Sequence, residues 1–161
     1  MRRSGLTVGL VALVAVSLTA CASGPAPTGP ATGAALQVSV PTGDFGALLN
    51  AQRASGGLPP ATADARLTAS AQGHAEAMAA GDFFSHAGAN GSNSSDRISA
   101  SGYTTCRSSE NIAYGQSSEA EVFQTWANSP PHLANIMMRG SVQFGLGHAG
   151  NKWVLDVAGV C

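Results

Sequence analysis

Apolar residues with helical spacing predict two helices in the first half of the chain. The first covers residues 44–55 and ends at the glycine pair 56–57. A longer helix is expected over residues 64–80, where Asp64 can cap the first turn and Gly81 stops the last. The apolar faces comprise Phe45, Leu48 and Leu49 in the first helix, and Leu67, Ala71, Ala75 and Met78 in the second.

The second half begins with irregular sequence and then returns to helix. Residues 85–93 are rich in Gly, Asn and Ser, which indicates a loop, and a short helical turn is expected at residues 96–100. Ser118 and Glu121 form a capping box, a pattern typical of a helix start. The helix that follows carries Val122, Phe123 and Trp126.

The end of the chain changes from helical to strand spacing. Val142, Phe144 and Leu146 alternate with polar or glycine positions, and the alternation resumes at residues 153–157 after a turn at 148–152. This pattern predicts a β-hairpin. Helices first and strands last favour an α+β fold, with helices packed on a small antiparallel sheet.

The first twenty residues have the organisation of an export signal. Two arginines precede residues 6–20, an uncharged run of 15 residues that is shorter than the roughly 20 apolar residues of a membrane span. The run ends in Leu18-Thr19-Ala20-Cys21, which resembles the bacterial lipobox. We therefore predict a lipoprotein signal peptide over residues 1–20, lipidation of Cys21, and a location on the extracytoplasmic side of the cell membrane. The alternative is ordinary cleavage that leaves a free cysteine.

The next segment, residues 21–40, is dominated by Ala, Pro, Gly, Thr and Ser and carries no charge, which is typical of a flexible tether. One folded domain is expected over residues 41–161. The chain has 8 basic against 9 acidic residues, and loss of the two signal-peptide arginines leaves 6 against 9, a net charge of -3. This balance excludes a nucleic-acid-binding domain, which needs a basic surface.

Three cysteines occur, and once Cys21 is assigned to lipid, Cys106 and Cys161 remain. In an exported, oxidising setting these two cysteines can pair in one way, so a disulfide is expected. It would connect the last residue to the middle of the domain and contribute about 4 kcal/mol by chain entropy. A metal role is the weaker alternative, because neither cysteine has a Cys or His at close ligand spacing.

The histidines are the remaining chemical candidates, because the sequence has no nucleophile motif and no phosphate-binding glycine loop. His86, Glu110 and His132 are each expected in a loop or at an element boundary, where they can form a shared metal or acid–base site. The alternative is that each side chain bridges only its own loop. His148 falls in the expected hairpin turn and is interpreted as solvated.

An ordered series of short motifs resembles the CAP superfamily, which includes cysteine-rich secretory proteins, wasp antigen 5 and plant pathogenesis-related proteins, and is also called the SCP domain. The resemblance covers nearly all of residues 45–159. Motifs that carry it include Leu49-Asn50-Ala51-Gln52-Arg53, Phe84-Ser85-His86, Ser109-Glu110-Asn111-Ile112-Ala113 and Ser129-Pro130-Pro131-His132. The resemblance implies an α-β-α sandwich with a central antiparallel sheet between helical layers.

In that family a cleft holds two histidines and two acidic residues. His86 and His132 match the histidines and Glu110 matches one acidic residue, whereas Ser129 stands where eukaryotic members usually carry the second. The resemblance therefore implies an incomplete set that can hold Zn²⁺, another divalent cation, or an ordered water alone. His74 matches a helical family histidine outside this set and is interpreted as a packing residue.

Two functions are compatible with this sequence. The first is a membrane-anchored binding module that engages a lipid, glycan or protein of the cell envelope, as the resemblance favours. The second is a metal-dependent hydrolase, a peptidase or esterase, with Glu110 as general base. Binding is favoured because no covalent nucleophile or oxyanion donor set is evident.

Overall fold

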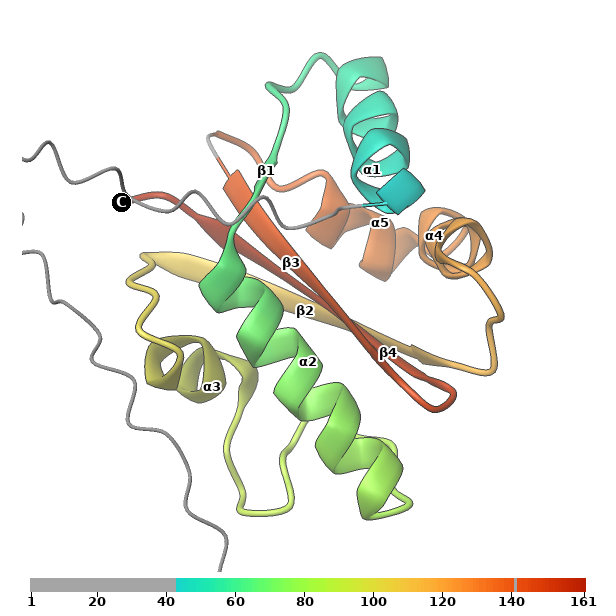
Figure 1. Ribbon diagram of the computed structural model, residues 1–161. Helices are drawn as coiled ribbons and strands as arrows, with labels where there is room; N and C mark the ends of the chain where they lie inside the picture. The colour runs from blue at the N-terminus through green and yellow to red at the C-terminus, as the bar shows by residue number, and fades with distance from the viewer. Residues whose placement is uncertain (1–42, 141) are drawn as a thin grey trace, which may run out of the picture. The chain divides into compact units, whose positions relative to one another are not determined.

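The structure is a computed structural model that describes residues 43–140 and 142–161 (Figure 1). The predicted signal peptide, the tether and Cys21 lie outside the described residues. The elements are α1 (Gly43–Ser55), β1 (Thr62–Ala63), α2 (Ala65–Ala80), α3 (Ser94–Ala100), β2 (Arg107–Tyr114), α4 (Glu119–Ala127), α5 (Pro130–Ile136), β3 (Val142–Ala149) and β4 (Lys152–Gly159). Among them, no helix combines the length and apolar character needed to cross a membrane.

The strands form one four-stranded sheet in the order β1-β3-β4-β2. The predicted hairpin is confirmed as β3 and β4, with a tighter turn than expected because only residues 150–151 lie between the strands. β2 pairs antiparallel with β4. β1 adds a two-residue parallel pairing to β3, so the sheet is mixed rather than purely antiparallel. A strand this short has no alternation that a sequence pattern can reveal.

Helices cover both faces of the sheet, which confirms the α+β fold with a sheet between helical layers (Figure 1). On one face α1, α4 and α5 pack around Phe45, whose ring meets Phe123 and Trp126 edge-on with centroid distances of 5.9 Å. On the other face lie α2 and α3. β4 serves both cores, with Trp153, Leu155 and Val157 on the first face and Val154 and Ala158 on the second.

Helix α2 lies directly against β3 because two strand positions lack a side chain. A Cβ atom at Gly145 would collide with the backbone of Leu67, and one at Gly147 would collide with that of Ala71. Asp64 caps α2 as predicted, accepting a hydrogen bond of 2.8 Å from the backbone N–H of Arg66. The close approach fixes the height of α2 above the sheet.

The predicted capping box of α4 is present only in part. The Ser118 hydroxyl accepts from the backbone N–H of Glu121, as expected. The Glu121 carboxylate instead accepts from the backbone N–H and the hydroxyl of Ser117, at 2.8 and 2.7 Å. The Glu121 side chain therefore bonds to Ser117, the residue before the N-cap, and not to the backbone of the N-cap residue Ser118 itself.

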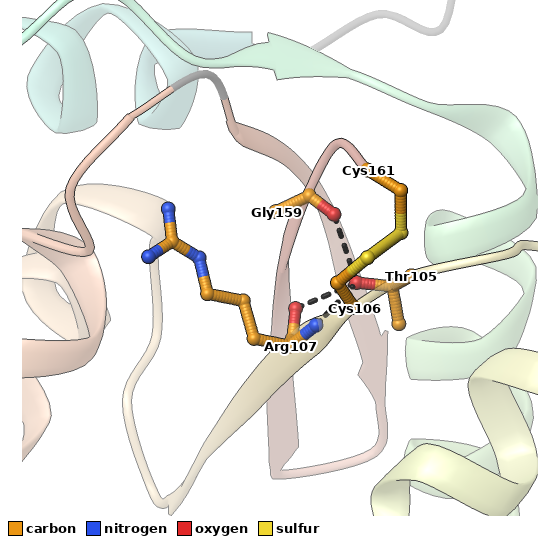
Figure 2. The surroundings of a disulfide bond; sticks show 5 residues. All are labelled: Thr105, Cys106, Arg107, Gly159 and Cys161. Atoms are coloured by element: carbon orange, nitrogen blue, oxygen red, sulfur yellow. Dashed lines mark hydrogen bonds between the residues drawn. A yellow bond between two sulfur atoms is a disulfide. The ribbon is translucent and has the colours of Figure 1, made fainter.

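A disulfide between Cys106 and Cys161 confirms the predicted pairing, with the Cα atoms 5.4 Å apart (Figure 2). Beside it the Thr105 hydroxyl lies 2.6 Å from the Arg107 carbonyl and 2.9 Å from the Gly159 carbonyl. The disulfide joins Cys106, the residue before β2, to Cys161, which follows β4. It therefore reinforces the pairing of these two strands at their common end.

The outer edge of β2 is occupied by side chains from the helices. Asn135 of α5 donates through Nδ2 to the Glu110 carbonyl at 3.4 Å. Trp126 of α4 donates through Nε1 to the Ile112 carbonyl at 3.3 Å. These two outward carbonyl groups of the edge strand thus have partners within the fold.

Candidate functional site

Glu110 lies in the middle of β2, not at a boundary as the sequence predicted, and its side chain is only 2% exposed. Both carboxylate oxygens are engaged: Oε1 lies 2.7 Å from His86 Nδ1, and Oε2 lies 2.6 Å from an Arg97 Nη2. A carboxylate buried this deeply needs such partners, because an unpaired charge away from water is costly. Glu110 is thus committed to holding two neighbouring side chains.

Arg97, in the short helix α3, connects Glu110 to the loop that carries His86. Its Nη2 also donates to the His86 carbonyl at 3.1 Å, and its Nη1 donates to the Ser92 carbonyl at 2.9 Å. One guanidinium therefore fixes two points of the loop and the strand carboxylate together. The planar, multiply donating group of arginine suits this geometry better than a lysine ammonium would.

His86 lies in the loop between α2 and α3, as predicted, with a side chain that is 60% exposed. Because a carboxylate only accepts, the bond to Glu110 places the ring proton on Nδ1. Among the described residues, Nε2 of His86 makes no hydrogen bond. The exposed edge of the ring therefore carries the nitrogen that is available to a ligand.

His132 lies in the first turn of α5, on the other face of the sheet from α2. Its Nδ1 is 2.8 Å from the hydroxyl of Ser129, the residue that precedes the helix. Burial lowers the pKa of His132, and the positive charge of a protonated His86 lowers it further. The ring of His132 therefore favours its neutral form.

Asn111 fixes the position of the helix that carries His132. This fully buried side chain donates through Nδ2 to the His132 carbonyl at 3.1 Å and accepts from Asn135 Nδ2 at 2.7 Å. Successive residues of a strand point to opposite faces of a sheet. Glu110 therefore positions His86 on the face of α2 and α3, while Asn111 positions His132 on the face of α5.

Residues 47–161 match the model of the family described as "CAP: Cysteine-rich secretory protein family". The chain belongs to this family. Its CAP domain is 31% identical over 114 residues to the uncharacterized protein YkwD of Bacillus subtilis, a match that covers 70% of this chain and 44% of that protein. The chain thus spans less than half the length of this curated relative.

The CAP fold is shared with solved structures of bacterial surface and secreted proteins. An extracellular SCP-domain protein from Bacillus anthracis superposes with a TM-score of 0.70 at 24% identity, covering 73% of this chain and 39% of that one. An outer surface protein from Borrelia burgdorferi gives a TM-score of 0.64 at 16% identity, covering 76% and 97% of the two chains. At these identities the likeness establishes the fold.

The predicted metal-ligand set of His86, Glu110 and His132 is arranged differently in this CAP domain. Within residues 43–140 and 142–161, no group of three or more His, Cys, Asp or Glu side chains is placed to hold a metal ion. Glu110 fits poorly as a direct ligand, because both its oxygens already bond to His86 and Arg97. It fits well as the partner that orients a ligating histidine. Of the three predicted ligands, the rings of His86 and His132 therefore remain as candidates for direct metal binding.

Asp156 is a buried acidic residue beside this site that the sequence analysis missed. It is fully buried in β4, is the register partner of Glu110, and accepts a hydrogen bond of 2.7 Å from the Ser70 hydroxyl. Burial raises its pKa to about 7; the Ser70 bond lowers it and the charge of Glu110 raises it further. The sequence does contain a signal for this residue, because Asp156 interrupts the apolar residues of β4.

The other two histidines have different surroundings. His74 is buried in α2 beside the Phe83 ring, with a centroid distance of 6.2 Å. His148 is exposed as expected, although it lies at the end of β3 and not in the turn. Its ring stacks on Trp153 with a centroid distance of 3.8 Å.

Proposed function

We propose that this CAP domain is an extracellular binding module held at the cell envelope by a lipid on Cys21, and that His86 and His132 together bind a divalent cation such as Zn²⁺. The observation that carries the proposal is that both rings are oriented through Nδ1, by Glu110 and by Ser129 respectively. Histidines that ligate metals typically use their second nitrogen in this way. When bound, such an ion supplies open coordination positions for donor atoms of a partner.

The protonation of His132 supports the same proposal. A histidine binds metal through a neutral ring, and the lowered pKa of His132 favours that form near neutral pH. The carboxylate of Glu110 additionally makes the His86 ring a stronger electron donor. Cation binding is expected to weaken in acid as the rings become protonated.

An exposed aromatic pair, one member of which precedes His86 by two residues, supports a binding role over catalysis. Phe84 and Tyr114 are 43% and 59% exposed, and their rings contact each other with a centroid distance of 5.0 Å. The Lys152 ammonium lies 5.6 Å from the first ring and 5.3 Å from the second. Exposed apolar side chains grouped in this way are typical of interaction surfaces. A lipid, glycan or protein of the envelope is the expected partner.

The position of Glu110 weakens the alternative of a hydrolase. A general base needs a carboxylate oxygen that can reach a water molecule at the reacting bond. Glu110 is 2% exposed, and its oxygens are used by Arg97 and His86.

The extracellular and outer-surface locations of the relatives, together with the disulfide, support export of this chain.

Zinc titration by calorimetry at pH 7.5 and pH 5.5 tests the proposal. The wild-type chain is expected to bind at the higher pH and to lose most of its affinity at the lower pH, because both rings must be neutral. His86→Ala and His132→Ala should each remove most of the binding. Binding that persists in the double variant would overturn the cation site.

His148→Ala serves as the matched control. It removes an exposed histidine that is not part of the proposed cation site, so it tests whether zinc binds to surface imidazoles in general. Zinc affinity is expected to remain at the wild-type value in this variant. An equal loss in His148→Ala and His86→Ala would contradict the assignment.

A further inference from the structure

A cleft of about 240 Å³ lies between α2 and the turn at residues 88–92. His74 and Ala77 line it from α2, Ala89 and Asn90 line it from the turn, and Arg97 lines it from α3. None of the three residues of the proposed cation site, His86, Glu110 and His132, lines it. This cleft therefore requires its own interpretation.

His74 contributes a hydrogen-bond acceptor to this region. Its Nε2 lies 2.9 Å from the Ser85 carbonyl, which only accepts, so the ring proton is on Nε2. Burial lowers the pKa of His74, and the ring is neutral at neutral pH. Nδ1 is then an unprotonated acceptor, and it has no hydrogen-bond partner among the described residues although the residue is only 2% exposed.

Arg97 contributes the complementary donor. Its Nη1 and Nη2 are used by Ser92, His86 and Glu110, whereas its buried Nε–H has no partner among the residues that the structure describes. The charge of the guanidinium is already balanced by Glu110. Two residues that line the cleft thus carry, on buried atoms behind its wall, one unused acceptor and one unused donor without an uncompensated charge.

The unused acceptor of His74 and the unused donor of Arg97 favour a ligand group that is neutral and is both a hydrogen-bond donor and an acceptor. A carboxylate would accept from Arg97 but would face the lone pair of His74 Nδ1, and an ammonium would face the arginine cation. The remaining lining includes Ala77, Ala89 and two glycines, which leave space for a methyl group. A secondary amide with a small apolar substituent meets all three conditions.

We propose that an amide group enters at this cleft, with its N–H donating to His74 Nδ1, its carbonyl accepting from Arg97 Nε, and its methyl group packing against Ala77 of α2. The inference concerns a site separate from the proposed cation site. The same chemistry occurs in an N-acetylated amino sugar and in a peptide. Because both nitrogen atoms are buried, the amide displaces the turn at residues 88–92, which is closed by bonds of 2.8 Å from Gly88 N to the Ser92 carbonyl and from Gly91 N to the Gly88 carbonyl.

Titration of the ¹⁵N-labelled full chain by nuclear magnetic resonance tests this proposal. N-acetylglucosamine and N-acetylalanine methylamide are the two amide probes, and glucosamine, glucose and acetate are the controls without an amide. Both amide probes are expected to shift the backbone signals of residues 88–92 and the ring nitrogen Nδ1 of His74. Stronger binding of the first probe indicates a glycan as the source of the amide, and stronger binding of the second indicates a peptide.

Ala77→Leu fills the cleft while leaving His74 and Arg97 in place, and it should weaken amide binding by at least about tenfold. Ala79→Leu is the matched control, because it makes the same change at another exposed position of α2 that does not line the cleft. Both variants should fold, since leucine is a good helix former. The proposal is overturned if neither amide probe shifts His74 Nδ1, if glucose binds as well as N-acetylglucosamine, or if Ala77→Leu binds like wild type.

Discussion

Glu110 and Asn111 are consecutive residues of β2, yet they position His86 and His132 from opposite faces of the sheet. The first bonds to the ring of His86, and the second bonds to the backbone of His132. β2 is an edge strand, so loops and helices on both faces can approach it. The relative position of the two rings is therefore set by a single strand, and changes to that strand should affect both.

Glu110→Gln should weaken zinc binding by about 10- to 100-fold, the usual effect of altering a group that orients a metal ligand. It should also lower the free energy of unfolding by about 3 kcal/mol, because Arg97, 13% exposed, loses its charge partner. Calorimetry and urea unfolding measure the two effects. Glu76→Gln, which changes an exposed carboxylate of α2, should leave both quantities unchanged. Wild-type zinc affinity in Glu110→Gln would contradict its orienting role.

Asp156 makes the stability of the domain depend on pH. Its folded pKa of about 7 lies above the ordinary value of 3.8, so the native state binds more protons than the unfolded state between these values. This contribution to stability is fully present below about pH 4 and is lost as the pH rises through 7. Asp156→Asn, neutral at every pH, should be more stable than wild type at pH 8 by up to about 4 kcal/mol, at 1.36 kcal/mol per pKa unit.

Urea unfolding of wild type and Asp156→Asn at pH 5 and pH 8 measures this difference. The advantage of the variant should shrink toward pH 5, since the wild-type side chain is then mostly protonated. Glu76→Gln again provides a control with no such dependence. A constant difference between the two proteins across this range would show that Asp156 does not titrate there.

Reduction of the disulfide, or Cys161→Ser, should lower the free energy of unfolding by about 4 kcal/mol, because a loop of 55 residues is released in the unfolded chain. For a domain of this size the melting temperature should fall by about 15 °C. Scanning calorimetry with and without a reductant measures the change. Two free thiols in exported protein, found by mass spectrometry, would contradict the bond.

Cys21→Ser should release the protein from the membrane fraction, because a lipid on this cysteine is the proposed anchor. Labelling with a radioactive fatty acid should mark wild type and leave the variant unmarked. Cys161→Ser is the control, since it removes a different cysteine and should retain the label. Equal membrane association of wild type and Cys21→Ser would refute the anchor.

The elements whose buried residues are apolar could be predicted from the sequence. The first two helices, α4 and the terminal hairpin all show the expected spacing. β2 escaped prediction because two of its most buried residues, Glu110 and Asn111, are polar. Their burial depends on partners in distant elements, such as Arg97 and Asn135, which local periodicity cannot reveal.

Because local periodicity does not show contacts between distant elements, the sequence analysis also missed several buried polar residues. Arg53 is completely buried and donates to the carbonyls of Pro59, Ile136, Met138 and Gly140, the farthest of which is 87 residues away along the chain. Asp156 bonds to Ser70, which is 86 residues away. The family resemblance pointed to His86, Glu110 and His132, whereas the groups that hold them emerged only from the three-dimensional arrangement.

The side chains of Asn135 and Trp126 that occupy the outer carbonyls of Glu110 and Ile112 in β2 have a consequence for the proposed anchoring of the domain at a membrane. Proteins confined to one plane meet often, and an open strand edge would allow neighbouring copies to join their sheets into aggregates. Here hydrogen bonds from α4 and α5 already occupy the carbonyl oxygens of Ile112 and Glu110, so they are not available to a second copy. Helices α4 and α5 therefore keep these two carbonyl oxygens from pairing with the sheet of a neighbouring copy.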